Sequence, residues 1–165
     1  SVVLLRRPDG EQRLRAHRDV VNSVRFSPDG RLLVSAGRDH VVIVWDVADG
    51  AIVHRLEEAH SASVNDARFS PDGRWIVTAG PISARLWRVA DGRPLMYLYG
   101  PRSSLTAAAF EPDSRTVVTR EADGTVRRYV CELCGGLEEL TALARSRLRR
   151  TGRELTDAER ARSLE

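Results

Sequence analysis

Three residues in this sequence are of the types that form a serine hydrolase triad: His17, Ser35 and Asp39. In such a triad a carboxylate orients an imidazole, which takes the proton from a hydroxyl nucleophile. The sequence has no Gly-x-Ser-x-Gly turn to present a nucleophile, no glycine-rich phosphate loop and no His-Glu-x-x-His zinc motif. We therefore predict no enzyme.

Cys131 and Cys134 form a Cys-x-x-Cys pair, which could be half of a zinc site or a redox pair. A structural zinc site needs four ligands. The sequence has no other Cys, and no His follows this pair. We predict two reduced thiols packed at a strand-to-helix junction, and we expect neither a metal nor a cofactor.

The candidate triad lies in a stretch that recurs along the chain. Several markers return at intervals of about 41 to 43 residues, and the last copy of the first marker is degraded. The recurring markers are Phe26–Gly30 with Phe69–Gly73 and Phe110–Ser114, Val47–Gly50 with Val89–Gly92, and Ala16-His17 with Ala59-His60.

Within one copy, apolar runs alternate with turns. Val24 and Phe26 alternate with polar neighbours, which is typical of a strand with one buried face. Ser27–Gly30 reverses the chain, because proline presets φ and Asp-Gly tolerates positive φ. Further apolar runs and turns follow, up to Leu56. Four antiparallel strands repeated every 40 to 45 residues indicate the blades of a β-propeller.

Trp45-Asp46 and Ala16-His17 stand where the WD40-repeat family has its Trp-Asp and Gly-His dipeptides, so residues 1–130 resemble a WD40 β-propeller. The likeness is to the bacterial type and to the C-terminal portion of the propeller. The resemblance implies an all-β fold: a propeller segment of about three blades, each a four-stranded antiparallel sheet, with a short C-terminal helical tail.

On this basis we divide the chain into five parts, starting in the middle of a blade, and expect it to be a fragment of a longer protein. The expected parts are a partial blade (1–15, its last two strands), two complete blades (16–58 and 59–103), a partial final blade (104–130) and a helical tail (131–165).

The resemblance also implies that one His, one Ser or Thr, one Asp and one Trp per blade form a hydrogen-bonded chain, which we call the tetrad. The second blade has all four, the third lacks the Asp, and the fourth has Gly100-Pro101 and Tyr129 in place of its His and Trp. The predicted tetrad members are His17, Ser35, Asp39, Trp45, His60, Thr78, Trp87, Thr119 and Asp123.

In the family, partners commonly bind the rim built by the loops before the first strand and between the second and third strands. Three polar residues here occupy one position in successive blades, as expected if they line one surface. A polar rim is also what any soluble propeller needs. The predicted rim residues are Asp19, Asn22, Arg38, Asn65, Pro81 and Thr106.

Beyond Cys131 the leucines fall at helical spacing, and an arginine-rich run covers 145–153. That run could contact phosphates, but acidic residues dilute it and no aromatic residues interleave. A solvated helix face, or one docked on an acidic partner, is the alternative interpretation.

The formal net charge is +3, and neither a signal peptide nor an apolar run of membrane length is present. We expect a cytoplasmic, non-catalytic scaffold or sensor that binds proteins, either as part of a larger bacterial multidomain protein or as a self-assembling ring. Membrane and nucleic-acid partners are not expected. The alternative is binding of nucleic acid or an acidic partner through the arginine-rich helix.

Overall fold

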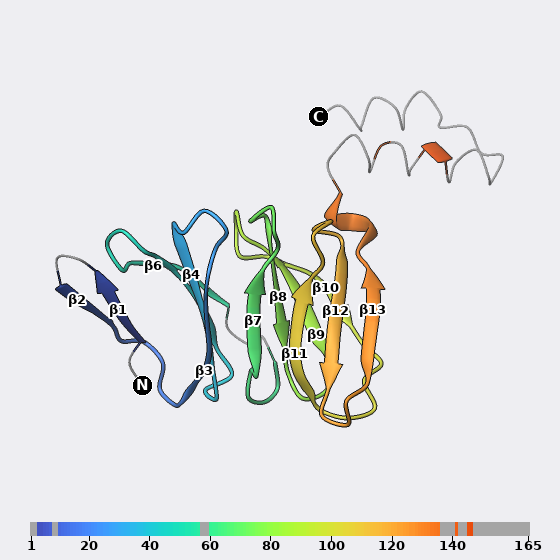
Figure 1. Cartoon of the computed structure of the whole chain (residues 1–165), viewed down its shortest axis with the longest axis horizontal. Helices are drawn as coiled ribbons and strands as arrows, with labels where there is room; N and C mark the ends of the chain where they lie inside the picture. The colour runs from blue at the N-terminus through green and yellow to red at the C-terminus, as the bar shows by residue number, and fades with distance from the viewer. Residues whose placement is uncertain (1–2, 8–9, 57–59, 136–140, 142–144, 147–165) are drawn as a thin grey trace. The chain divides into compact units, whose positions relative to one another are not determined.

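The computed structural model describes residues 3–7, 10–56, 60–135, 141 and 145–146. These residues form thirteen strands in four antiparallel sheets, so the all-β fold is confirmed (Figure 1). The chain divides into two compact units, Ser1–Cys131 and Glu132–Glu165. All the described strands lie in the first unit.

The second sheet along the chain is a four-stranded meander. Its strands are β3 (Val21–Phe26), β4 (Leu32–Gly37), β5 (Val42–Asp46) and β6 (Ile52–Leu56), hydrogen-bonded in sequence order. Short connections favour this order, because antiparallel neighbours need only a tight turn between them.

The third sheet repeats the second. It contains β7 (Asp66–Phe69), β8 (Trp75–Ala79), β9 (Ala84–Arg88) and β10 (Pro94–Leu98), again in sequence order. Figure 1 shows the two sheets side by side.

The sheets at the two ends have fewer strands. The first pairs β1 (Val3–Arg7) with β2 (Gly10–Leu14). The fourth contains β11 (Leu105–Phe110), β12 (Thr116–Glu121) and β13 (Val126–Val130). In the described part of the chain, β13 therefore pairs on one side only.

The recurring Ser-Pro-Asp-Gly marker forms the same turn each time. Ser27 Oγ donates to Asp29 Oδ1 at 2.6 Å and accepts from the Leu32 N–H at 2.9 Å. Gly30 closes the turn at φ 72°, a left-handed conformation that glycine adopts without a Cβ penalty. In the degraded third copy, Ser114 adopts φ 55° at the glycine position.

The core lies between the sheets. β4 and β5 bury side chains on both faces, as their continuous apolar runs require. One cluster joins the first and second sheets and the other joins the second and third. The buried members are Val3, Leu5, Leu14, Leu33, Ile43 and Trp45 in the first cluster, and Val34, Ala36, Val42, Val44, Leu56, Val64, Ala67, Phe69, Ile76 and Trp87 in the second.

The two cysteines correct one prediction. Both are disulfide-bonded, and because they are the only cysteines in the sequence they are bonded to each other. Cys131 and Cys134 are 1% and 0% exposed, so they are buried as predicted but are not reduced thiols. Their three-residue spacing brings the sulfurs together through the 3₁₀ turn Glu132–Cys134.

Most of the predicted helical tail, including most of the arginine-rich run at 145–153, lies outside the described residues. Within the tail, Thr141, Arg145 and Ser146 are helical. Among the described residues, no helix has the length and apolar character needed to span a membrane.

Candidate functional site

The four tetrad residues of the second sheet form one hydrogen-bonded chain. Trp45 Nε1 donates to Ser35 Oγ at 2.8 Å, and Ser35 Oγ lies 2.8 Å from His17 Nε2. His17 Nδ1 in turn lies 2.9 Å from the Asp39 carboxylate. These distances fit a chain in which Ser35 donates its one proton to His17 and His17 donates to Asp39.

Burial limits the chemistry that the hydrogen-bonded tetrad of the second sheet can perform. Ser35 is 0% exposed and its hydroxyl bonds to both a ring nitrogen and an indole, so a substrate cannot reach it. Burial of Asp39 raises its pKa, but hydrogen bonds from His17 and the Arg18 N–H outweigh burial and lower the pKa. The carboxylate is therefore held ionised as an acceptor.

The third sheet has a shorter version of the tetrad. His60 Nε2 lies 2.9 Å from Thr78 Oγ1, and Trp87 Nε1 donates to that oxygen at 3.1 Å. Burial, together with the positive charge of Arg85, lowers the His60 pKa to about 4. His60 is therefore neutral near pH 7, as expected for an imidazole with no acid to stabilise its charged form.

A glycine makes room for each imidazole. A Cβ on Gly37 would lie 2.7 Å from His17 Nδ1, and a Cβ on Gly80 would lie 2.4 Å from His60 Nδ1. Both distances are shorter than a Cβ contact allows. Each imidazole therefore fits only because Gly37, the last residue of β4, and Gly80, just after β8, have no side chain.

The fourth sheet does not join its two predicted tetrad members. Thr119 Oγ1 is buried with no hydrogen-bond partner, while the exposed Asp123 accepts the Thr125 N–H at 2.8 Å. We predicted that both would keep their tetrad roles without a histidine. Without the ring between them, these side chains have nothing to connect them.

Glu121 fills the space instead, and the sequence analysis missed it. Glu121 lies at the position of Gly37, is 1% exposed, and accepts from the N–H groups of Arg102 and Ser103 at 2.8 and 2.9 Å. Arg127 Nε donates to it at 2.6 Å, and this bond chiefly lowers the Glu121 pKa to about 2. The signal was a large side chain at the glycine position of a repeat that has lost its histidine.

Two of the predicted rim residues connect neighbouring sheets. Asn22 Nδ2 donates to the Val64 carbonyl at 2.9 Å, and Asn65 Nδ2 donates to the Leu105 carbonyl at 2.7 Å. Thr106, at the same repeat position, bonds within its own sheet to the Arg120 carbonyl at 3.2 Å. Asn22 and Asn65 thus make the same kind of bond between neighbouring repeats, and their predicted part in partner binding stays a prediction.

The remaining predicted rim residues lie apart from these contacts. Asp19 is exposed and its carboxylate accepts the Val20 N–H at 2.6 Å. Arg38 is exposed in the turn between β4 and β5, and Pro81 is half-buried in the turn between β8 and β9.

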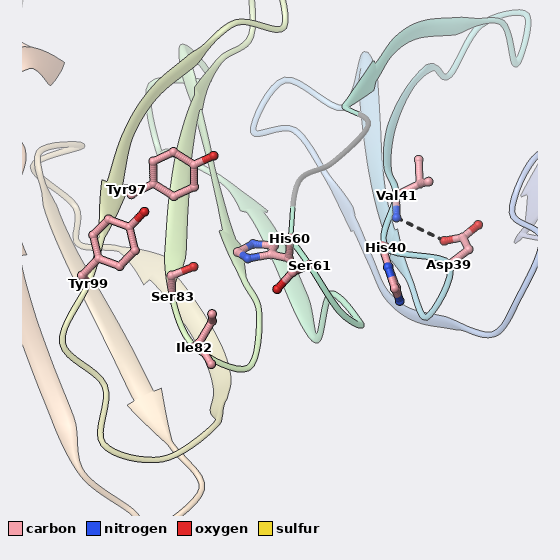
Figure 2. A pocket seen from close by; sticks show the side chains of 9 residues that line it. All are labelled: Asp39, His40, Val41, His60, Ser61, Ile82, Ser83, Tyr97 and Tyr99. Atoms are coloured by element: carbon pink, nitrogen blue, oxygen red, sulfur yellow. Dashed lines mark hydrogen bonds between the residues drawn. The ribbon is translucent and has the colours of Figure 1, made fainter.

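A cleft of about 740 Å³ opens beside those two turns, between the second and third sheets. Figure 2 shows Tyr97 and Tyr99 on one side and His40 and Val41 on the other, with His60 between them. We call it the inter-blade cleft; it is lined by Asp39, His40, Val41, His60, Ser61, Ile82, Ser83, Tyr97 and Tyr99.

Two of the residues that line the inter-blade cleft, Tyr97 and Tyr99, belong to a column of planar groups. The Arg85 guanidinium lies 4.3 Å from the Trp87 ring centroid and 4.2 Å from that of Tyr97. Tyr97 stacks in turn on Tyr99, with centroids 5.5 Å apart and 20° between the ring planes. Tyr99 at the end of the column is 68% exposed, and neighbouring Ile82 is 66% exposed.

Among the described residues, no group of three or more His, Cys, Asp or Glu side chains is arranged to hold a metal ion. What the arrangement offers is a buried polar framework and an exposed apolar and aromatic cleft beside it. Such a combination suits binding of another molecule at the surface.

Comparison with known proteins supports the repeat pattern. The family model for the WD domain, G-beta repeat, matches residues 10–46, 50–88 and 92–129. The crystal structure of RRP9 WD40 repeats resembles this chain with a TM-score of 0.68 over 71% of this chain and 37% of that one. At 23% identity, that likeness shows the fold.

The similar curated proteins match over one repeat. Small ribosomal subunit protein RACK1 of Glycine max is 43% identical over 44 residues, covering 27% of this chain and 14% of that protein. Ribosome assembly protein 4 of Saccharomyces cerevisiae is 46% identical over 41 residues, covering 25% and 8%. These relatives are eukaryotic and do not support the predicted bacterial type.

Proposed function

The chain belongs to the WD40-repeat family, and we propose that it is a non-catalytic module that binds other proteins through the inter-blade cleft. Repeat families of this architecture place their variable residues in loops at the edges of the sheets, where partners can reach them. The single observation that carries the proposal is the cluster of exposed Ile82, Tyr97 and Tyr99 at that cleft.

Exposure of these three residues is what favours binding. They are 66%, 43% and 68% exposed and come from two separate segments of the third sheet. An apolar and aromatic cluster of this kind on a solvent-exposed surface marks an interaction site, and tyrosine is enriched at such sites. Binding would remove this surface from water.

The polar framework beside the cleft supports a non-catalytic function. In the second sheet every tetrad side chain bonds to another member, and the hydroxyl that could act as nucleophile is 0% exposed. The framework therefore orders the loops that form the cleft and leaves binding to the exposed residues.

We also propose that further blades, from a longer chain or from other copies, complete a closed ring. β13 pairs on one side only among the described strands, and Val126 and Val130 on it are 59% and 65% exposed. Repeat units bury their faces against neighbours, so a further sheet would cover these residues.

Affinity capture from a cell extract tests the proposed function. The full chain is compared with Ile82→Glu, which places a charge in the inter-blade cleft, and with Ile52→Glu, a matched change at an exposed residue of β6. We expect the wild type and Ile52→Glu to capture the same proteins and Ile82→Glu to lose at least one of them. Equal capture by all three chains would reject the cleft as the binding surface.

A further inference from the structure

The column of planar groups that reaches the inter-blade cleft through Tyr97 and Tyr99 already includes one cation, the Arg85 guanidinium. Arg85 lies between the rings of Trp87 and Tyr97, at 4.3 and 4.2 Å from their centroids. A guanidinium is planar and weakly hydrated, so it stacks on aromatic faces that carry negative charge density. The column is therefore a cation-binding surface within the protein itself.

The outer end of that column is open. Tyr97 has Arg85 over one face and Tyr99 stacked against it, whereas Tyr99 is 68% exposed. Residues two apart in an extended strand point to the same side, which explains why both rings face the cleft (Figure 2). Most of Tyr99 is therefore accessible to a further planar group.

The residues that line the cleft carry no fixed positive charge, and the positive charge of Arg85 beside them reaches His60. No Arg or Lys is among the nine lining residues, and Asp39 supplies the one carboxylate among them. The carboxylate bonds to His17, so it acts on an occupant through its field and not by direct contact. Arg85 contacts the Tyr97 ring and is not among the residues that line the cleft.

We propose that the inter-blade cleft binds an arginine side chain presented by a partner protein. Its guanidinium stacks on the open face of Tyr99, and its hydrocarbon stem lies against Ile82. This inference rests on the proposed function and names the chemistry that the partner supplies. The absence of Arg and Lys from the lining argues against a nucleic acid, whose phosphates need basic contacts.

The test uses an array of random decapeptides, each printed in three forms with arginine, lysine or citrulline at its centre. Citrulline keeps the planar shape of arginine without its charge, and lysine keeps the charge without the plane. The full chain is probed as wild type, Tyr99→Ala, Tyr99→Phe and Phe26→Ala. Phe26 provides a matched control, since it is an aromatic residue of the second sheet that is 55% exposed.

We expect wild-type binding to be strongest for arginine peptides and about 3- to 30-fold weaker for their citrulline forms, the range of a cation–π contact. Tyr99→Ala should lose this preference, Tyr99→Phe should keep it because the ring remains, and Phe26→Ala should behave as wild type. Near-UV circular dichroism of each variant verifies that the chain is folded.

Three results would overturn the inference. Equal binding of the arginine and citrulline forms would show that charge plays no part, and an arginine preference that survives Tyr99→Ala would place the contact elsewhere. Binding of a single-stranded RNA oligomer that Tyr99→Ala abolishes, without any arginine preference, would assign the surface to nucleic acid. Peptides that bind through Tyr99 but lack arginine would refute the inference while leaving the proposed function intact.

Discussion

Ser35 is the shared member of the hydrogen-bonded chain in the second sheet, and its one hydroxyl serves two nitrogen atoms. It accepts from Trp45 Nε1 and lies 2.8 Å from His17 Nε2. Both neighbouring side chains are buried, so neither can exchange this partner for water. A buried polar group left without its partner costs about 1–3 kcal/mol.

Ser35→Ala should therefore lower the free energy of unfolding by about 2–4 kcal/mol, because two buried nitrogens lose their partner at once. Urea unfolding followed by tryptophan fluorescence measures this. Ser104→Ala changes an exposed serine and should alter stability by less than about 0.5 kcal/mol. A Ser35→Ala variant as stable as wild type would contradict the structural role of the tetrad.

Glu121 makes the stability of the fold depend on pH. Its pKa is lowered from 4.5 to about 2, first by the hydrogen bond from Arg127 and then by the N–H groups of Ser103 and Arg102. A lowered pKa means that the folded state holds the carboxylate ionised more readily than the unfolded chain does. Its stabilisation is therefore present above pH 4.5 and is lost as the pH falls toward 2.

Glu121→Gln isolates this contribution from those of the other carboxyl groups. The variant should be less stable than wild type at pH 7, because an amide cannot accept from three donors as a carboxylate does. The difference between the two proteins should shrink as pH falls from 4.5 to about 2. Urea unfolding at a series of pH values measures it, and a difference that stays constant over that range would show that Glu121 is not the titrating group.

At the scale of the elements, the sheets are held together by side chains that reach from one to the next. Asn65 precedes β7 and donates to the carbonyl of Leu105, the first residue of β11, at 2.7 Å. Ser23 of β3 likewise donates to Asp66 of β7 at 2.8 Å. These bonds act in addition to the apolar clusters between the sheets.

Asn65→Ala should weaken the attachment of the fourth sheet to the third. The net loss is about 1 kcal/mol, since one hydrogen bond between the sheets disappears. Amide hydrogen exchange should become faster in β11–β13 and stay unchanged in β3–β6. Ser104→Ala is the control, because it changes an exposed side chain just before β11 and should leave exchange in β11–β13 unchanged. Uniformly faster exchange throughout would argue against a local link.

The repeat pattern predicted the elements better than it predicted their roles. Turn residues and apolar runs recur in register, so the strands could be placed from the sequence. The same recurrence led us to predict that Asn22 and Asn65 line a partner-binding rim, and it did not reveal that both also bond between sheets. Repetition in a stack of similar units can reflect packing as readily as function, and it does not separate the two.

Residues that depart from the repeat pattern form features of the structure that the pattern does not predict. Glu121 stands where other copies have glycine, and it accepts hydrogen bonds from Arg102 and Ser103, just after the Gly100-Pro101 that replaces the histidine. The cleft escaped notice because Tyr97 and Tyr99 belong to the outer strand or follow it, where no marker recurs. Their meeting with Ile82 depends on the register of β10 against β9 and on the adjacent turn.

At the scale of the whole molecule, the sheets at the two ends leave apolar side chains uncovered. Leu4 in the first sheet is 51% exposed, and in the fourth sheet Val126 and Val130 are 59% and 65% exposed. Val126 and Val130 lie on the same face of β13, because they are four residues apart in a strand. A further sheet packed on that face would bury both.

If copies of the chain close the ring, self-association should depend on this face. We expect wild type to form oligomers in sedimentation equilibrium as concentration rises, and Val126→Asp with Val130→Asp to remain a monomer, because burying two carboxylates opposes packing. Val53→Asp, at a residue of β6 that is 43% exposed, should associate as wild type does. A wild-type chain that stays monomeric at all concentrations would exclude closure by its own copies, and covering this face would then require blades from elsewhere in a longer chain.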